Sequence, residues 1–417
     1  MAKVPEYNQY IREYYLPNQV MPYDSIITFT LELLTKNVAI KHFYNSYFSA
    51  ICIDEFQDTN LLNLALIHQL MSDNSKVIAF GDSMQQIYGF LGAIPNLIDK
   101  ELENNSIDYI RLKTNYRFKK GSSMYLLDQN LRNFQENMES YKPEKVPTVN
   151  VIHGCKISDE ADKITSFIKK ISAEHEQSLK IAILFSQNSK NTTEVLQRLS
   201  KNKLRYFNGL FKEDSKDFSY FQGLVYQAFE KNFSSKIFTK SDIDSFIRII
   251  NSEMSHSEYS SSFITLLFGF LKNTVLTINR LERNNYIKNV LLTGTLFNSI
   301  NTVEENLIIS TVHGAKGLEW DYVIIANFEQ GEFPNYFETK GIGSFSDSGE
   351  MIIKEQNKKA IKELINKFYV AFSRAKKGFI LAYSDWHWEG GYYPQLKPAE
   401  ISCLAKQSLL IVKEMSV

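Results

Sequence analysis

The sequence predicts an α/β protein whose parallel sheets are covered by helices, with a helical insertion in the second of two sheet domains. Short apolar runs recur along the chain and alternate with stretches whose apolar residues stand three and four positions apart. This alternation is typical of strands joined by helices in parallel sheets. It stops over residues 214–297, where periodic Phe, Ile and Leu continue without strand-like runs. At 417 residues the chain has room for two or three domains of ~150 residues.

The individual elements follow from the same patterns. The opening ~45 residues are expected to be helical, before a short buried strand over 48–54. A helix and a second strand, 77–82, come next, and both strands end in acidic residues. Chemistry in an open parallel sheet sits at the carboxyl ends of the strands. Later strands are expected at 148–153, 181–185, 307–312, 323–326 and 378–383, helices at 160–171 and 192–199, and a closing helix near the end of the chain.

Composition and charge limit the class of protein. Apolar residues make up 44% and charged residues 23%, as in ordinary soluble proteins, and no apolar run approaches the ~20 residues that cross a bilayer. The polar start lacks a secretory signal, and Cys52, Cys155 and Cys403 are too far apart for a disulfide framework or a zinc site. We therefore expect a cytoplasmic protein without a membrane partner. The 47 basic and 47 acidic residues cancel, which weakly disfavours a nucleic-acid partner but is compatible with a local basic groove.

Two acidic residues, Asp54 and Glu55, directly follow the first strand in the string DEFQD. Mg²⁺ bound to nucleotide phosphates needs a hard oxygen ligand on a rigid strand end, and hydrolysis needs a second carboxylate to orient water. Adjacent Asp and Glu supply both groups. The alternative is a strand that leaves the core into an acidic, solvated turn, and this string alone does not decide between the two.

Further polar strings follow in order. The second strand leads into GDSMQQIYGFLGA, where the Gln85 amide can sense a phosphate and Tyr88 and Phe90 can stack on bases, although core packing is the ordinary role of such rings. In TNYR, Arg117 can neutralise charge on a transferred phosphoryl group or form a surface ion pair. TVHGAKGLEWD after a later strand and YVAFSRAKK on an expected helix complete the set. Each string could be structural by itself, but their joint occurrence in this order is very unlikely by chance.

In this order the five strings resemble motifs II to VI of the UvrD/Rep/PcrA-type superfamily 1 DNA helicases. The resemblance covers Ile51 to Ser384 outside the helical insertion. It implies two RecA-like domains, the first incomplete, with ATP in the cleft between them and DNA moved with 3′ to 5′ polarity. The implied domains are 1–112 (partial 1A with a 1B remnant), 113–213 with 298–417 (2A), and 214–297 (2B-like insertion). The short insertion resembles that of the helicase subunit of the Gabija anti-phage system.

The resemblance also implies a role for individual residues. Asp54 would hold Mg²⁺, Glu55 would be the catalytic base, and Gln85 would couple the γ-phosphate of ATP to DNA. Arg117 and Arg374 would contact the γ-phosphate. The remaining implied contacts are Tyr116 on the adenine, Gly317 and Glu319 at the nucleotide and its ribose, and Tyr88, Phe90, Thr311 and His313 on single-stranded DNA.

One motif of the family does not occur in the sequence. The phosphate-binding loop Gly-x-x-x-x-Gly-Lys-Ser/Thr is absent, and the nearest string, Lys119 to Ser123, has the wrong order and follows TNYR. The resemblance therefore implies that roughly the first hundred residues of a helicase are missing, less than one domain. Leu91 and Ser186 also stand where the family commonly has Arg, which weakens the attraction for DNA phosphates.

Three functions remain open on the sequence. The first is an ATP- and Mg²⁺-dependent helicase or translocase acting on single-stranded or partly duplex DNA, favoured by the retained Asp54, Glu55, Gln85, Arg117 and Arg374. The second is a remnant that binds DNA or a partner without turning over ATP, favoured by the missing loop. The third is a regulatory subunit of an anti-phage defence complex with a nuclease partner. The sequence contains no convincing carboxylate cluster with a following Lys, so a nuclease site in this chain is not expected.

Overall fold

The chain divides into two compact units. One comprises Met1–Thr114 with Ile365–Lys367, and the other comprises Asn115–Leu364 with Phe368–Val417. The computed structural model describes residues 3–72, 75–104, 108–175, 178–254, 257–390 and 394–416. Within these ranges, every helix is too short or too polar to cross a membrane.

The first unit is built on a βαβ element. Strands β1 and β2 pair in parallel, with Ala50 opposite Lys76, and helix α4 connects them as a parallel pair requires. Asn60 caps this helix, because its Oδ1 accepts from the N–H of Asn63 at 2.9 Å. The helices and strands of this unit are α1 (Val4–Tyr10), α2 (Tyr23–Lys36), α3 (Val38–Tyr47), β1 (Ala50–Ile53), α4 (Leu61–Leu70), β2 (Lys76–Ala79) and α5 (Leu97–Asn104).

The two strands of the first unit are more exposed than the sequence predicts. We expected a buried strand over 48–54, but β1 alternates between exposed and half-buried residues and every residue of β2 is exposed. Ile78 and Phe80 are 48% and 53% exposed. The reason is that β1 and β2 pair only with each other among the described residues, so a run apolar enough for a sheet interior lies on the surface.

The second unit contains a seven-stranded sheet in which all pairs of neighbours are parallel, in the order β11-β3-β8-β7-β4-β6-β5. A separate antiparallel hairpin is formed by β9 and β10. The elements are α6 (Ser123–Glu136), β3 (Thr148–Gly154), α7 (Ile157–Glu174), β4 (Ile181–Phe185), α8 (Lys190–Lys201), β5 (Phe207–Asn208), α9 (Lys216–Asn232), α10 (Lys240–Glu253), α11 (Ser260–Thr277), α12 (Arg283–Leu292), β6 (Leu307–Thr311), β7 (Trp320–Ile325), α13 (Tyr336–Ile342), α14 (Lys358–Ser373), β8 (Ala375–Ser384), β9 (Trp386–Glu389), β10 (Gln395–Pro398), α15 (Cys403–Lys406) and β11 (Ile411–Glu414).

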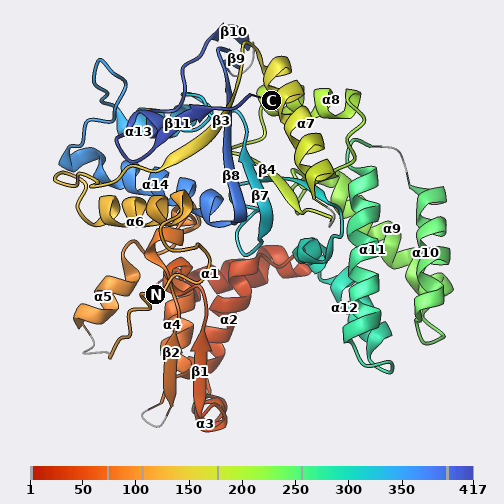
Figure 1. Ribbon diagram of the computed structural model, residues 1–417. Coiled ribbons are helices and arrows are strands. Elements are labelled where there is room, and N and C mark those ends of the chain that lie inside the picture. Colours follow the sequence, from red (N-terminus) through yellow and green to blue (C-terminus); the bar gives the residue numbers. More distant parts are fainter. Residues whose placement is uncertain are drawn as a thin grey trace. The chain divides into compact units, whose positions relative to one another are not determined.

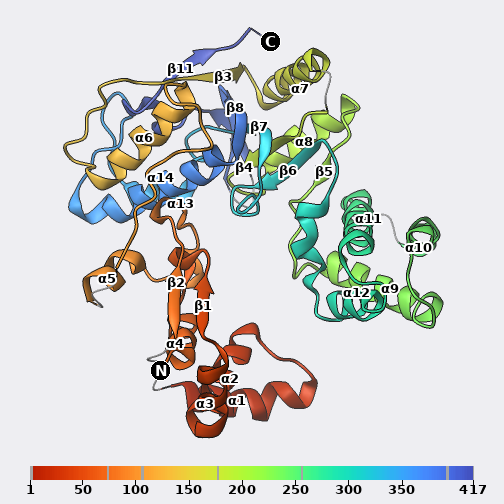
Figure 2. The same ribbon diagram turned by 60° about the horizontal axis from the view of Figure 1, so that its bottom comes forward.

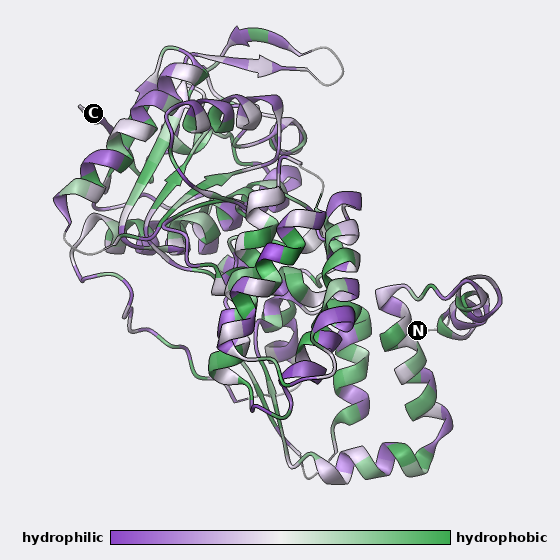
Figure 3. Cartoon of the chain, turned by 90° about the vertical axis from the view of Figure 1, so that its right-hand side faces the viewer, coloured by the Kyte–Doolittle hydropathy of each residue, from purple (hydrophilic) through white to green (hydrophobic). Residues whose placement is uncertain are grey.

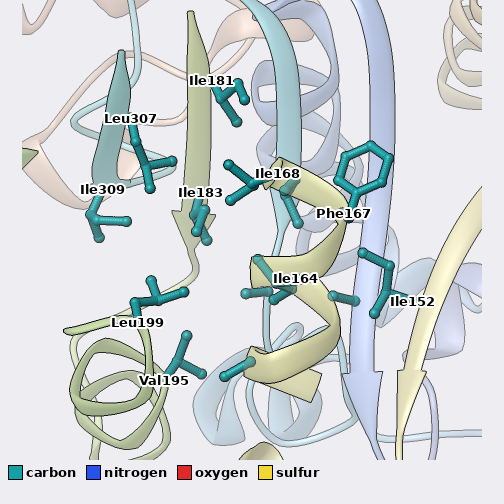
Figure 4. Packing of buried hydrophobic residues seen from close by; sticks show 14 of the residues in the cluster. Ile152, Ile164, Phe167, Ile168, Ile181, Ile183, Val195, Leu199, Leu307 and Ile309 are labelled. Atoms are coloured by element: carbon teal, nitrogen blue, oxygen red, sulfur yellow. The ribbon is translucent and has the colours of Figure 1, made fainter. Parts of the chain in front are cut away.

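Both faces of this sheet are covered by helices (Figure 1). Successive residues of a strand point to opposite faces, so neighbours along β8 pack against different helices. Ile380 belongs to the core under α7 and α8, where Ile164, Ile183 and Val195 meet (Figure 4). Phe379 points the other way and packs against α14, with its ring 5.3 Å from that of Phe372. The strands are therefore apolar on both faces, as their green colour in Figure 3 shows.

The helical stretch that interrupts the strand–helix alternation lies at the β5 end of this sheet (Figure 2). The Asn208 N–H of β5 donates to Ser262 Oγ of α11 at 2.8 Å. Just after β5, Phe211 packs with its ring centroid 4.9 Å from that of Phe263 and 5.5 Å from that of Phe297. The helices α9 to α12 confirm the predicted helical stretch, and a shared aromatic core joins it to the sheet.

The five later strand predictions are confirmed by β3, β4, β6, β7 and β8. The predicted closing helix is wrong. Only the single turn of α15 is helical there, and β11 follows it as an edge strand parallel to β3. Its ends are fixed by backbone hydrogen bonds of 2.9 Å from Ile411 N–H to Pro147 O and from Met415 N–H to Val151 O. The segment forms a strand because it pairs with the edge strand β3. Such a pairing between distant parts of the chain leaves no local pattern in the sequence.

Two buried carboxyl groups lie at the strand ends of the second unit, and one of them comes from α7. Glu160 Oε1 accepts from the N–H of Asn327 at 3.0 Å, and Glu329 Oε1 accepts from the N–H of Ser384 at 2.6 Å. Both Glu side chains are fully buried. Burial raises the pKa of Glu160 to about 8, opposed by the hydrogen bond from Asn327, and burial together with the nearby Glu160 raises the pKa of Glu329. Both groups therefore favour the protonated, neutral form.

These raised pKa values predict a pH-dependent stability. The native state holds a proton on Glu160 that the unfolded chain releases near pH 4.5, so the stabilisation is complete below about pH 4.5 and is lost as the pH rises through about 8. We expect the free energy of unfolding to fall over this range, measured by urea denaturation at several pH values. Glu160→Gln should flatten this dependence, whereas Glu174→Gln on an exposed turn of the same helix should not. An unchanged slope in Glu160→Gln would contradict the assignment.

Candidate functional site

The acidic residues of the first unit gather at the carboxyl ends of its two strands. Asp54 and Glu55 follow β1, and Asp82 follows β2. Because the strands are parallel, both ends lie at the same edge. The ladder continues past them: the Phe80 N–H donates to Ile53 O and the Phe56 N–H donates to Phe80 O, each at 2.8 Å. These bonds fix the backbone on both sides of the carboxylates.

A chain of side-chain hydrogen bonds connects Glu55 to Gln85. Gln57 Nε2 donates to Glu55 Oε2, and Gln57 Oε1 accepts from the N–H of Asp82 at 3.0 Å. Gln85 Nε2 donates to Asp82 Oδ2 at 3.2 Å. A Cβ at Gly81 would lie 2.9 Å from Gln57 Oε1, so any other residue at this position would displace the Gln57 amide. A displacement at Gln85 can therefore reach Glu55 through two residues.

Gln57 was not among the predicted site residues. It is 2% exposed, and its amide both donates and accepts, as a link between two carboxylate-bearing turns requires. Its place in the string DEFQD, two residues after Glu55, was the available signal. A buried amide beside a charged strand end is a candidate for such a link, but the pairing with the turn after β2 depends on the fold.

The backbone of Glu55 is in the left-handed region, with φ 52° and ψ 39°. This conformation costs on the order of 1 kcal/mol for a residue other than glycine, and such strain is concentrated at functional sites. The Glu55 N–H donates to Asp54 Oδ1 at 2.9 Å, and both residues are exposed. Asp54 thus presents a hard oxygen donor at a fixed strand end, which fits a Mg²⁺ that arrives with phosphate and keeps several waters.

Of the two aromatic residues predicted to stack on bases, Tyr88 has a described side chain and Phe90 does not. Tyr88 is half-buried, and burial raises the pKa of its phenol, with smaller contributions from the charges of Asp58 and Glu55. The side chain of Phe90 is outside the described residues. Its backbone belongs to the short helical turn Gly89–Leu91.

The basic residues of the second unit meet around one carboxylate. Arg117 Nη2 forms an ion pair with Glu319, and Arg117 Nη1 donates to the carbonyl of Ser373. Lys376 Nζ lies 2.9 Å from Glu319 Oε2. Arg374 is 4% exposed and donates to Val370 O at 3.1 Å and to Ser373 Oγ at 2.9 Å. Three sequence motifs thus converge at the amino ends of β7 and β8, where Trp320 pairs with Ala375.

The cations determine the charge state of Glu319. Burial by itself raises the pKa of this carboxyl, but the hydrogen bond from Lys376 and the charges of Arg117, Lys376 and Arg374 outweigh burial, so the pKa is lowered. Glu319 therefore stays ionised at neutral pH and holds the guanidinium of Arg117 in place. An anionic ligand that displaced the Glu319 carboxylate would therefore meet cationic side chains that already lie close together.

Two further predicted nucleotide contacts are in the second unit. Tyr116 is 93% exposed, an unusual state for a large ring and one that leaves its face open to a planar ligand. The adjacent turn is fixed by Asn115 Oδ1, which accepts from the N–H of Arg117 at 3.0 Å and of Phe118 at 2.9 Å. Gly317 adopts φ +80°, which other residues rarely adopt.

The predicted DNA contacts of the second unit lie at the opposite edge of its sheet. Thr311 ends β6, and β6, β4 and β7 run parallel, so Thr311 marks their carboxyl edge. Thr311 Oγ1 accepts from the N–H of Gly314 at 3.0 Å and so holds the turn that contains the half-buried His313. The structure thus brings Arg117, Glu319 and Arg374 together and places Thr311 and His313 at the other end of the strands.

Comparisons with known proteins match two successive parts of the chain to helicase domains. Residues 2–107 match the UvrD/REP helicase N-terminal domain, and residues 209–385 match the UvrD-like helicase C-terminal domain. The chain is similar to DNA helicase II of Rickettsia typhi, with 22% identity over 91% of the chain and 67% of that protein. It is also similar to the ATP-dependent DNA helicase PcrA of Staphylococcus aureus, with 29% identity over 42% of the chain but only 24% of that protein's length.

The two parallel α/β units and the order of their charged strand ends define a superfamily 1 helicase fold. Both matched domains occur in the order in which the motifs follow each other along the chain. The chain belongs to the UvrD/Rep/PcrA-type DNA helicases.

The buried amide of Gln57 predicts a local effect of substitution. Gln57→Leu leaves the part-buried Asp82 N–H without this acceptor, at a cost of about 1–3 kcal/mol, while water can replace the donor that the exposed Glu55 carboxylate loses. Amide hydrogen exchange of the peptide that contains Asp82 should become about tenfold faster or more. Gln69→Leu on α4 is the control, because its side chain is not part of this chain of hydrogen bonds. Equal exchange rates in the two variants would show that Gln57 does not hold the turn.

Proposed function

We propose that this chain carries the hydrolytic and charge-neutralising groups of an ATP-driven DNA translocase or helicase with 3′ to 5′ polarity. The observation that supports this proposal best is the convergence of Arg117, Glu319 and Arg374 from three separate motifs in the second unit. Such a cluster of cations suits the charge that develops on a phosphoryl group during transfer. The family to which the chain belongs makes ATP the candidate phosphoryl donor and DNA the candidate track.

The first unit would supply the hydrolytic groups. We assign Asp54 as the protein ligand of Mg²⁺, whose bound ion neutralises phosphate charge, and Glu55 as the base that orients and deprotonates water. The strained backbone of Glu55 and its bond to Gln57 hold the carboxylate in one direction. Gln85 is assigned as the group that senses the γ-phosphate. Its bond to Asp82 then provides a route by which that contact affects Glu55.

The second unit would supply the cations and the base-stacking ring. We assign Arg117 and Arg374 to the γ-phosphate, Tyr116 to the adenine, and Gly317 with Glu319 to the nucleotide and its ribose. Arg374 already donates to Val370 and Ser373, so its guanidinium is oriented before any ligand arrives. Glu319 holds Arg117 by charge, and competition from phosphate would release it.

The DNA contacts assigned to Thr311 and His313 lie at the carboxyl edge of β6, and Tyr88 and Phe90 are assigned to single-stranded DNA in the first unit. In the second unit the nucleotide and DNA residues are then at opposite ends of the same parallel strands. A rigid sheet between the two sets can transmit a change at the nucleotide to the DNA end. This arrangement supports coupling of hydrolysis to movement.

Two other functions differ from this proposal in measurable ways. A remnant would bind DNA or a partner without turnover, and a regulatory subunit of an anti-phage complex would act only with its nuclease partner. The ordered link from Glu55 to Gln85 and the cation cluster favour turnover, because neither is needed for binding alone. ATP hydrolysis by the chain supplied with a phosphate-binding segment therefore separates the translocase from the other two functions.

The missing phosphate-binding loop predicts slow ATP turnover. The sequence contains no Gly-x-x-x-x-Gly-Lys-Ser/Thr string, so the chain should hydrolyse ATP slowly, and joining a segment with this loop to its amino end should restore turnover stimulated by single-stranded DNA. In the joined protein, Glu55→Gln should lower kcat by about 10²-fold or more. Glu6→Gln on α1 is the control. Fast hydrolysis by the unjoined chain would refute the first part, and an inert joined protein would favour the remnant.

Another prediction concerns the exposed ring of Tyr116. Tyr116→Ala should raise the Kd for ATP about tenfold, since a base–aromatic contact contributes on the order of 1–3 kcal/mol. The Kd for inorganic tripolyphosphate should not change, because that anion has no base. Tyr220→Ala, which removes another exposed ring from the same unit, is the matched control. Equal effects on ATP and tripolyphosphate, measured by calorimetry, would rule out stacking on the adenine.

A further inference from the structure

A buried carboxylate on α6 lies behind the cation cluster of the second unit. Asp128 is 7% exposed and has no part in the function proposed above. Three side chains from three segments donate to it. Asn115 Nδ2 lies 3.1 Å from Asp128 Oδ2, while Tyr369 OH at 2.7 Å and Arg132 Nε at 3.3 Å share Oδ1. A carboxylate buried in this way remains favourable only when its oxygens are paired.

One of these contacts leads to Arg117. Asn115 uses its two amide atoms for different tasks: Nδ2 donates to Asp128, and Oδ1 accepts from the backbone N–H groups of Arg117 and Phe118. The amide plane is therefore fixed at one end by the carboxylate and at the other end holds the turn that presents Tyr116 and Arg117. Without Asp128, this amide could rotate and leave the turn.

The other contacts lead to the segment of Arg374. Tyr369 is on α14, one helical turn before Ser373, whose carbonyl accepts from Arg117. Arg132 Nη2 donates to Tyr369 OH at 2.5 Å, and its guanidinium lies 4.8 Å from the ring centre of Tyr369. The rings of Phe118 and Phe372, 4.9 Å apart, join the same two segments. Asp128 is thus bonded to both arginine-bearing segments.

We propose that Asp128 is a positioning residue that fixes Arg117 relative to Arg374 by bonding Asn115 on one side and Tyr369 on the other. This inference rests on the proposed function for its consequence, since it predicts that phosphate binding by the two arginines requires Asp128. The positioning itself depends only on the contacts within the second unit.

An exchange of the two side chains tests the proposal. Asp128→Asn keeps the oxygen used by Tyr369 but places an amide opposite Asn115 Nδ2, so two donors face each other. Asn115→Asp keeps the acceptor for the Arg117 N–H but places two carboxylate oxygens in contact. In the double variant the new amide at 128 donates to the new carboxylate at 115, and the link is restored. Each single variant should therefore be impaired and the double variant should recover.

Two readouts separate positioning from general stability: hydrogen exchange on the full chain, and MgATP binding on the chain joined to a phosphate-binding segment. In each single variant, amide hydrogen exchange at Arg117 and Phe118 should become about tenfold faster and the Kd for MgATP should rise about tenfold. Both values should return to within about threefold of wild type in the double variant. Asp162→Asn is the matched control. It removes the charge of a carboxylate that accepts from Arg198 Nε at 2.6 Å between α7 and α8, and it should lower the melting temperature without changing either readout.

The outcomes are distinct. Unchanged exchange at Arg117 in both single variants, or no recovery in the double variant, would overturn the positioning role. Faster exchange with an unchanged Kd for MgATP would overturn its consequence for phosphate binding. If the wild-type chain joined to a phosphate-binding segment does not bind MgATP at all, the proposed function fails, while the exchange data still decide whether Asp128 holds the turn.

Discussion

The ion pair between Arg117 and Glu319 is the interaction on which the candidate site of the second unit depends. It brings a residue that precedes the sheet to the amino ends of β7 and β8, beside Arg374 and Lys376. A guanidinium cluster of this kind would repel itself without a carboxylate at its centre. Glu319 therefore gathers the cations, and the lowered pKa of its carboxyl keeps it charged over the whole neutral range.

Because the strands of each parallel sheet run in one direction, all their carboxyl ends lie at one edge and all their amino ends at the other, and this determines which charged residues lie together. In the first unit the carboxylates follow the strands, at the edge where open parallel sheets usually carry chemistry. In the second unit the cations precede the strands, and the turn held by Thr311 follows them. Acidic and basic groups thus come from opposite strand ends in the two units. The buried Gln57 and Asp128 play similar parts, since each is a polar group inside its unit that holds a charged turn on the surface.

Most strands of the large sheet, and the positions of several charged residues at the ends of elements, could be predicted from the sequence. The apolar runs predicted five strands of the large sheet, and the polar strings placed Glu55 just after a strand and Arg374 between a helix and a strand, as the structure has them. Long-range pairing was not predictable: β11 joins β3 across the length of the unit, and the exposure of β2 depends on which strands surround it. Gln57 and Asp128 were missed for the same reason, since a buried polar residue has no pattern of its own until its partners are known. The roles of the individual residues remain predictions.

The most direct test of the central claim compares ATP with ADP. Contact between Arg117 and the γ-phosphate predicts that Arg117→Ala weakens the binding of MgATP much more than that of MgADP, because only ATP carries the group that this cation meets. Titration calorimetry on the chain joined to a phosphate-binding segment measures both constants. A loss of about tenfold or more for ATP with little change for ADP is the expected result. Equal losses for the two nucleotides, or none for either, would contradict the assignment of this arginine to the γ-phosphate.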